Sequence, residues 1–150
     1  MIGRGVSVIV SSCGHDLTPS LMRAVGSAIT PAGDRITVFL NRSQSRQLLQ
    51  DIARTGRVAA VFSEPYSHRT VQVKATGARL REACPEDEPE LQRYCKAMQG
   101  ELGRIGFGPA FASAMLAYRL EDLSAVEFTP DQAFDQTPGP RAGQPLGAGS

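Results

Sequence analysis

The chain has 150 residues, of which 41% are hydrophobic and 21% are charged, and its formal net charge is +1. This composition is ordinary for a globular protein, and the length fits one domain with a substantial core. A net charge so close to zero argues against a broad basic surface and therefore against nucleic acid as a partner, because such binding depends on many phosphate contacts. Any phosphate recognised here would bind at a local site.

The cysteines and histidines narrow the chemistry further. Cys13, Cys84 and Cys95 have neither a CxxC spacing nor an even count, so we expect free thiols in the cytoplasm rather than a disulfide framework. His15 and His68 are the only histidines, and neither has a metal-ligand spacing to the cysteines, so no metal site is expected. The apolar run at 6–10 is too short for a signal peptide or a membrane span.

Strands dominate the first 40 residues. Residues 6–11 alternate as a strand, residues 20–25 predict a second strand, and residues 36–40 predict a third after turn formers at 30–34. Between Ser43 and Gly56, apolar residues at helical spacing predict one short helix with a serine at its N-cap and a glycine just past its end. The pattern is an antiparallel meander followed by a helix.

The second half adds strands and one more helix. Residues 58–62 form a nearly continuous apolar run, and residues 70–74 alternate so that Thr70, Gln72 and Lys74 share a polar face. A helix is predicted within 87–104, and strands are predicted at 115–120 and 124–128. About seven strands and two helices predict a mainly β fold, a β-barrel with helices packed on its rim.

The amino-acid composition changes at Pro130, after which proline and glycine are frequent. Phe134 and the segment 137–140 can still dock as a fixed loop, because proline lowers the entropy lost on ordering. We therefore expect one domain at 1–143 and a flexible tail at 144–150.

Two sets of polar residues are candidates for ligand binding. Ser43, Ser45 and Arg46 stand at the start of the first predicted helix, where a helix N-terminus favours anions. The alternative is a capping serine and a solvated arginine. Thr70 and Gln72 belong either to a ligand-binding face or to an ordinary wet face of an antiparallel sheet.

Other polar residues allow equally open interpretations. Arg23 either binds a ligand or pairs with a carboxylate such as Asp34 or Asp51. His68 is either an exposed turn residue or a polar group close to a ligand. No pair of nucleophile and base can be assigned, so catalytic residues stay unknown.

The order of these motifs is similar to a known family. Residues 57–63 (RVAAVFS), 67–74 (SHRTVQVK) and Gly77 resemble the pyridoxamine 5′-phosphate oxidase-like group, the flavin-binding split β-barrels. Upstream, the segments 23–25, 36–40 and 43–46 fall in the order of that family, and 134–143 looks like the tail of its small members. The resemblance covers residues 6–143. It implies a six- to seven-stranded antiparallel split barrel that forms a homodimer, with FMN in a groove between subunits.

The resemblance also implies roles for particular residues. Four of them would hold the FMN phosphate and three would lie near the flavin ring, namely Arg23, Ser43, Ser45 and Arg46 for the phosphate and Arg69, Thr70 and Gln72 for the ring. Arginine forks and serine hydroxyls can bind a phosphate dianion without a high net charge. Ala28 and Gln47 stand where the oxidases usually have lysines, which implies weaker flavin binding or none.

The implied activity is that of an FMN-dependent oxidoreductase, which transfers hydride or electrons between the flavin and an unidentified small molecule. The oxidases grip pyridoxamine phosphate with a C-terminal arginine-containing segment, whereas this chain has a Pro/Gly-rich tail, so vitamin B6 oxidation is not expected. One alternative is a non-enzymatic dimer of the same fold that binds flavin or haem. Another is an interaction protein with an empty groove. Whether the chain is an enzyme is left open.

Overall fold

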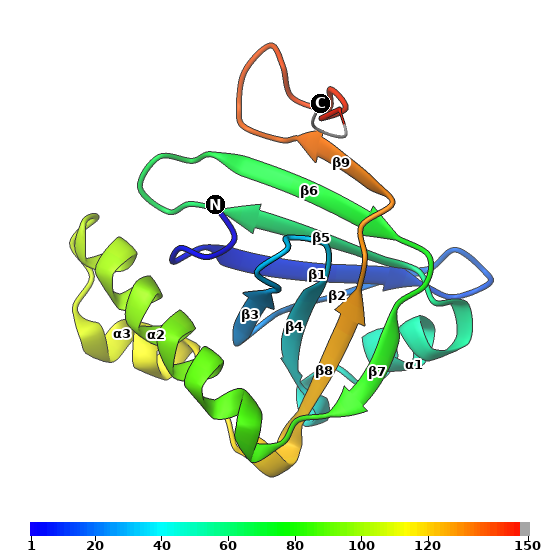
Figure 1. Ribbon diagram of the computed structural model, residues 1–150, viewed down its shortest axis with the longest axis horizontal. Helices are drawn as coiled ribbons and strands as arrows, with labels where there is room; N and C mark the ends of the chain where they lie inside the picture. Colours follow the sequence, from blue (N-terminus) through cyan, green and yellow to red (C-terminus); the bar gives the residue numbers. More distant parts are fainter. Residues whose placement is uncertain (148–150) are drawn as a thin grey trace.

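The structure of the protein is a computed structural model that describes residues 1–147, and in this range it consists of two antiparallel sheets and three α-helices (Figure 1). The strands are β1 (Ser7–Cys13), β2 (Pro19–Arg23), β3 (Gly26–Ile29), β4 (Ile36–Asn41), β5 (Val58–Ser63), β6 (Thr70–Ala75), β7 (Arg79–Glu82), β8 (Leu123–Phe128) and β9 (Gln132–Asp135). The helices are α1 (Arg46–Thr55), α2 (Glu88–Gly103) and α3 (Pro109–Met115), with short 3₁₀ turns η1 (Arg42–Gln44), η2 (Pro85–Asp87) and η3 (Leu120–Asp122).

One sheet has five strands in the order β2-β1-β5-β6-β9, and the other has four in the order β3-β4-β8-β7. All neighbouring strands pair antiparallel. In Figure 1 the five-stranded sheet runs across the view and the four-stranded sheet runs steeply to it. The predicted mainly β fold with flanking helices is confirmed.

The core lies between the sheets because the strands alternate between buried and less buried residues. Most inward residues of β1, β5 and β6 are fully or almost fully buried, and they include Val8, Val10, Ala60, Phe62 and Val73. Residues of β4 and β8 complete this core from the other sheet. Helix α1 adds its apolar stripe, as the helical spacing between 43 and 56 predicted, and ends at Gly56 in the left-handed conformation with φ 68°.

The strand predicted at 20–25 is confirmed for residues 20–23, which belong to β2, but its last two residues form a corner between the two sheets. Strand β2 ends at Arg23 and β3 begins at Gly26, and these strands belong to different sheets. Between them, the Ala24 N–H donates to the Val8 carbonyl at 2.9 Å in one sheet, and the Val25 N–H donates to the Phe39 carbonyl at 2.9 Å in the other. Both residues are buried, so the apolar sequence there reflects a sheet-to-sheet crossing rather than a longer strand.

The strand predicted at 115–120 is wrong. Pro109 opens α3, a position that proline favours, and the Leu116 N–H continues the helical pattern by donating to the Ala112 carbonyl at 3.0 Å. Leu116 is buried in the core, whereas Tyr118 packs against the second apolar cluster beside α2. The alternation that predicted a strand therefore comes from a helix end and a turn with buried residues on two sides.

Strands β7 and β9 are present although the sequence pattern did not predict them. Each has four residues, and each lies at the edge of a sheet. The segment after β9 docks on its own sheet, because Thr137 Oγ1 accepts the Thr70 N–H at 3.0 Å and the Leu146 N–H donates to the Ala133 carbonyl at 2.8 Å. Of the predicted flexible tail at 144–150, residues 148–150 lie outside the described residues, and the division at residue 143 stays a prediction.

Candidate functional site

The five-stranded sheet has one face on the core, and we call its other side the outer face. A single row of directly paired residues crosses it from β2 to β9, in the order Arg23, Ile9, Val61, Gln72 and Phe134. Directly paired residues point to the same side of an antiparallel sheet. With strands about 4.8 Å apart, Arg23 and Gln72 are separated by three strand spacings, or about 14 Å. The row thus places one predicted phosphate residue and one predicted ring residue on the same surface.

Small side chains surround this row. Ser7, Ser63 and Thr70 form one neighbouring row, and Ser11 and Ala59 begin the other. All five are partly buried, and each has a short side chain. Between Arg23 on the edge strand β2 and Gln72 on β6, the outer face therefore carries Ile9 and Val61 with short side chains beside them.

Arg23 is exposed, and its guanidinium donates to the Ser7 hydroxyl. The two carboxylates considered as partners have other partners, so that ion-pair interpretation is wrong. Asp34 accepts from the Thr30 hydroxyl at 2.6 Å, and the buried Asp51 accepts from Ser20 and Gln47 at 2.6 and 2.9 Å. Within residues 1–147 no carboxylate lies within ion-pair distance of Arg23.

The predicted phosphate residues at the helix start have different environments. The Ser43 hydroxyl and N–H both donate to Asp122, at 2.6 and 3.1 Å, and the hydroxyl bond is the main reason why the pKa of Asp122 is lowered. Ser45 is the N-terminal flanking residue of α1 but makes no capping bond. It is only 2% exposed, and its Oγ has no hydrogen-bond partner among the described residues. Arg46 is exposed and opens the helix.

The three predicted ring residues lie together at the start of β6. Thr70 Oγ1 is 3.0 Å from the His68 carbonyl oxygen and 3.1 Å from Ser63 Oγ, while Gln72 Oε1 accepts weakly from Gln136 at 3.5 Å. Arg69 is exposed immediately before the strand. His68 is an exposed turn residue in the left-handed conformation with φ 59°, as one of its two interpretations predicted.

Two site residues beside Arg69 were missed by sequence reasoning. Arg69, Asp135 and Arg141 line a cavity of about 430 Å³ together with Thr137. The Arg141 Nε lies 3.9 Å from Asp135, and the pKa of Asp135 is lowered chiefly by the hydrogen bond from the Thr137 N–H. Only pairing between β6 and β9 brings these residues together, and that pairing carries no local sequence signal.

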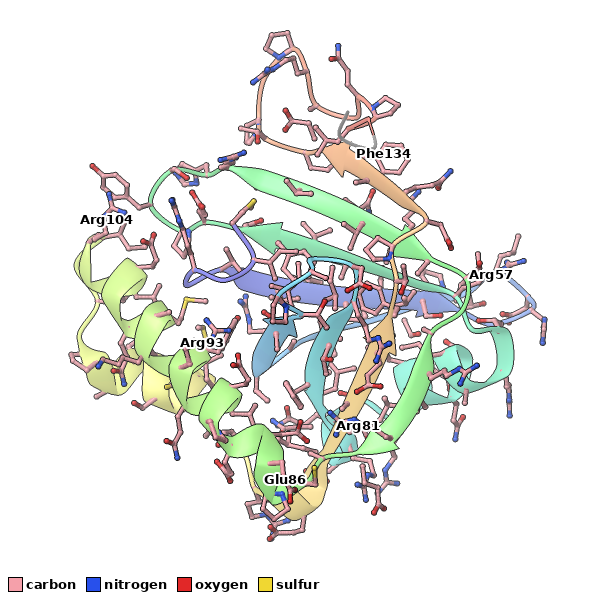
Figure 2. All side chains as sticks on the ribbon, in the orientation of Figure 1. Arg57, Arg81, Glu86, Arg93, Arg104 and Phe134 are labelled. Carbon is pink, nitrogen blue, oxygen red and sulfur yellow. The ribbon has the colours of Figure 1, made fainter. Side chains whose placement is uncertain are left out.

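A second cavity was also missed. It has a volume of about 730 Å³ and lies where β1 ends and β5 begins, with lining residues that include Ser11, Cys13, Arg57, Lys74, Asp131 and Gln132. Figure 2 shows Arg57 at this end of the sheet, with Phe134 above it on β9. In the sequence, the one feature that could have indicated this cavity was the outward position of Lys74 in its strand.

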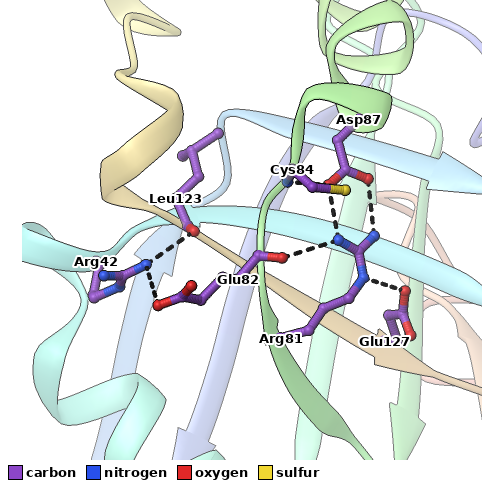
Figure 3. A network of polar contacts seen from close by, with 7 residues as sticks. All are labelled: Arg42, Arg81, Glu82, Cys84, Asp87, Leu123 and Glu127. Carbon is purple, nitrogen blue, oxygen red and sulfur yellow. Dashed lines mark hydrogen bonds and ion pairs between the residues drawn. The ribbon is translucent and has the colours of Figure 1, made fainter.

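A polar network centred on Arg81 lies outside the outer face (Figure 3). Arg81 donates to both oxygens of Asp87 at 2.8 Å and to Glu127 at 2.7 Å, and it also donates to the Glu82 carbonyl. The Arg81 guanidinium is the main cause that lowers the pKa of Asp87 to about 2. These bonds link β7 to β8 and to Asp87, the residue before α2.

Metal-ligand clusters and membrane-spanning helices are both absent from residues 1–147. The described part of the chain holds no group of three or more histidine, cysteine, aspartate or glutamate residues placed to bind a metal ion. No helix of residues 1–147 combines the length and the apolarity needed to cross a membrane.

Comparisons with known proteins identify the fold. No protein-family model and no curated protein sequence matches the chain. Among solved structures, an F420 reductase is similar with a TM-score of 0.58 at 16% identity, over 88% of this chain and 91% of that chain. A candidate pyridoxamine 5′-phosphate oxidase from Lactobacillus delbrueckii has a TM-score of 0.52 at 15% identity, over 85% and 83%. A pyridoxamine 5′-phosphate oxidase-related, FMN binding protein from Nostoc punctiforme has a TM-score of 0.51 at 13% identity, over 94% and 78%.

These likenesses are distant in sequence and cover most of each chain, so they define the fold. The chain has the split β-barrel fold of pyridoxamine 5′-phosphate oxidase-like proteins. The resemblance stated from residues 57–77 is confirmed at this level.

Proposed function

We propose that this chain binds FMN on the outer face of the five-stranded sheet. The observation that supports the proposal is the paired row that has Arg23 and Gln72 on the same side of the sheet. Proteins of the same fold include an FMN binding protein and an F420 reductase, which supports a flavin or deazaflavin as the ligand class. FMN is the ligand that we propose within that class.

The residues present fit a phosphate-bearing flavin. Arg23 and Arg46 supply exposed guanidinium groups, which bind phosphate oxygens by charge-assisted hydrogen bonds. The Ser45 hydroxyl is an orphaned polar atom at the start of α1, and a phosphate oxygen there would satisfy it. Arg69, Thr70 and Gln72 would orient the ring through hydrogen bonds. The bound flavin would supply the redox chemistry.

One predicted phosphate residue has to be left out. The Ser43 hydroxyl already donates to Asp122, a carboxylate that is negatively charged at neutral pH. A second anion at Ser43 would meet this charge, so we no longer include Ser43 among the phosphate ligands. Together with Ala28 and Gln47 in place of family lysines, this predicts weaker binding than in a lysine-rich site.

The proposal includes a homodimer. Ile9 and Val61 are only half-buried on the outer face, and Leu21 is 64% exposed at its β2 edge. A second copy would cover these apolar groups symmetrically and enclose the flavin. Light scattering at micromolar concentration is expected to give twice the mass of the chain. A stable monomer would contradict an intersubunit flavin site.

The proposed activity is transfer of hydride or electrons between the flavin and a small organic molecule, in the cytoplasm. The free thiols of Cys13, Cys84 and Cys95 support the location. The competing function is binding or sensing without turnover, which the missing lysines and the occupied Ser43 favour. Reduction of bound flavin by NADH or NADPH supports the oxidoreductase, whereas flavin binding without reduction by either donor supports the second function.

An absorbance spectrum followed by FMN titration tests the binding. Purified protein is expected to show the two visible bands of an oxidised flavin or to bind added FMN saturably. The double variant Arg23→Ala, Arg46→Ala should lose this binding. The matched control Arg54→Ala, Arg79→Ala also removes two exposed arginines, and it should keep wild-type affinity. Unchanged FMN affinity in the first variant would remove the phosphate assignment.

A further inference from the structure

The cavity at the end of the outer face is distinct from the residues assigned to the flavin. It lies between Cys13 at the end of β1, Arg57 directly before β5, and Lys74 in β6, and Asp131 closes one side directly before β9. Ala59, which is paired with Lys74, has a small side chain and therefore leaves the centre of the cavity open. The volume of about 730 Å³ lies in the range of small-molecule sites. We call this cavity the β5–β6 groove.

The charges of the β5–β6 groove are unbalanced. Arg57 and Lys74 are exposed, and within residues 1–147 neither has a carboxylate at ion-pair distance. The Lys74 ammonium lies 5.1 Å from the centre of the Phe134 ring, which holds it in place by a cation–π contact. Asp131 has a role of its own, because its Oδ2 accepts from the Thr76 N–H at 2.8 Å and from the Thr76 hydroxyl at 3.0 Å. The β5–β6 groove thus has two cationic side chains, Arg57 and Lys74, and one carboxylate, Asp131.

The side chains also match one kind of ligand. Arginine and lysine only donate hydrogen bonds, and a planar guanidinium matches the two oxygens of a carboxylate or phosphate. Ala59 and the neighbouring strand residues give the floor an apolar part. We propose that the β5–β6 groove binds a small organic anion, in which Arg57 and Lys74 hold the carboxylate or phosphate group and the apolar body lies on the floor.

The position of the groove links it to the outer face. Lys74 and Gln72 lie two residues apart on the same side of β6, which corresponds to about 7 Å along a strand. A ligand in the groove would therefore lie beside the ring residues. The inference itself does not depend on a bound flavin, and its test uses the protein without added cofactor.

Nuclear magnetic resonance of ¹⁵N-labelled full-length protein tests the site directly. The probes are benzoate and phenyl phosphate, and benzyl alcohol is the neutral control of similar shape. We expect saturable shifts of the Ala59, Ala75 and Thr76 amides with at least one anion, and weaker binding of the alcohol by about tenfold or more. The tighter anion identifies the group as carboxylate or phosphate. Equal binding of the alcohol, or shifts confined to other parts of the chain, would overturn the proposal.

Variants and salt then test the two cations. Arg57→Gln and Lys74→Gln should each weaken the tighter probe by about tenfold, the loss expected for one charge-assisted hydrogen bond. Arg54→Gln removes an exposed arginine on α1 that does not line the groove, and it should change affinity less than about twofold. Raising the salt concentration from about 50 to about 500 mM should weaken binding to the wild-type protein several-fold. Equal losses in all three variants, or binding indifferent to salt, would contradict the assignment without depending on the stability of any variant.

Discussion

The two sheets differ in what covers their outward sides. On the four-stranded sheet, Phe39, Leu123 and Ala125 are buried under Leu91 of α2 and form a second apolar cluster. On the five-stranded sheet, the outward side carries small and polar residues around the partly exposed Ile9 and Val61, and within the described chain no helix lies over it (Figure 1). Both sheets are antiparallel with the same inward core. The chain therefore buries the outward side of the four-stranded sheet for stability and leaves the other outward side uncovered, which is where we propose that the flavin binds.

The largest difference in stability between the two outward sides is expected when one leucine on each is truncated to alanine. Leu91 is 1% exposed against the four-stranded sheet, and Leu21 is 64% exposed at the edge of the outer face. Leu91→Ala should lower the free energy of unfolding by about 2–5 kcal/mol, because it leaves a cavity, whereas Leu21→Ala should change it by about 0.5 kcal/mol or less. Urea denaturation followed by circular dichroism measures both. Similar losses would show that the outer face is also part of the stabilising core.

The close approach of Gly5 to α2 gives a second prediction. A Cβ on Gly5 would lie 2.2 Å from the Ala97 carbonyl oxygen of α2, whereas a Cβ on Gly103 at the end of the same helix meets nothing within 4 Å. Gly5→Ala should therefore destabilise the protein by about 1–3 kcal/mol through overpacking against backbone. Gly103→Ala should be neutral or slightly stabilising, because alanine favours the helix. The midpoints of thermal unfolding would separate them, and an unshifted midpoint in Gly5→Ala would refute the close contact.

The network around Arg81 predicts a pH dependence. The pKa of Asp87 is lowered from its usual value near 3.8 to about 2, chiefly by its hydrogen bonds with Arg81. A carboxyl whose pKa is lowered in the folded state adds stability above pH 3.8, and this stability is lost as the pH falls from 3.8 to 2. Since the group is partly solvated, we expect a contribution of about 1 kcal/mol. Urea denaturation between about pH 2 and 6 measures it, and Arg81→Gln should flatten the profile. A variant profile as steep as that of the wild type would assign the dependence to other carboxyls.

The smallest stability effect is expected at Arg23 on the outer face. Arg23→Ala removes an exposed side chain with one hydrogen bond, to the Ser7 hydroxyl, so the free energy of unfolding should change by about 0.5 kcal/mol or less. The same change should weaken FMN by about tenfold or more, because a charge-assisted phosphate contact is lost. Denaturation and FMN titration of one preparation measure both quantities. A large stability loss with unchanged FMN affinity would make Arg23 a structural residue.

The elements with strong periodicity were predictable, and those with tertiary causes were not. Alternation in 36–40, 58–62 and 70–74 and the helical stripes in 43–56 and 87–104 correspond to β4, β5, β6, α1 and α2. The polar edge strands β7 and β9 have no apolar alternation, and their pairing is decided by the neighbouring strands. The segment 115–120 alternates only because Leu116 and Tyr118 face different apolar clusters.

The candidate site likewise has features that the sequence predicted and features that it did not. Strand parity was enough to put Thr70, Gln72 and Lys74 on one face, because side chains alternate along any extended strand, whatever its neighbours in the fold. Two other features were visible only in the folded chain. One is the position of Arg23 in the paired row, and the other is the hydrogen bond from Ser43 to Asp122, which is 79 residues away. Local spacing was sufficient to predict β4, β5, β6, the two main helices and the polar side of β6, because these features depend on residues that are close in the chain. Which polar groups meet and which outward face stays open followed from the tertiary structure alone, because hydrogen bonds and burial between distant segments depend on how the sheets pair.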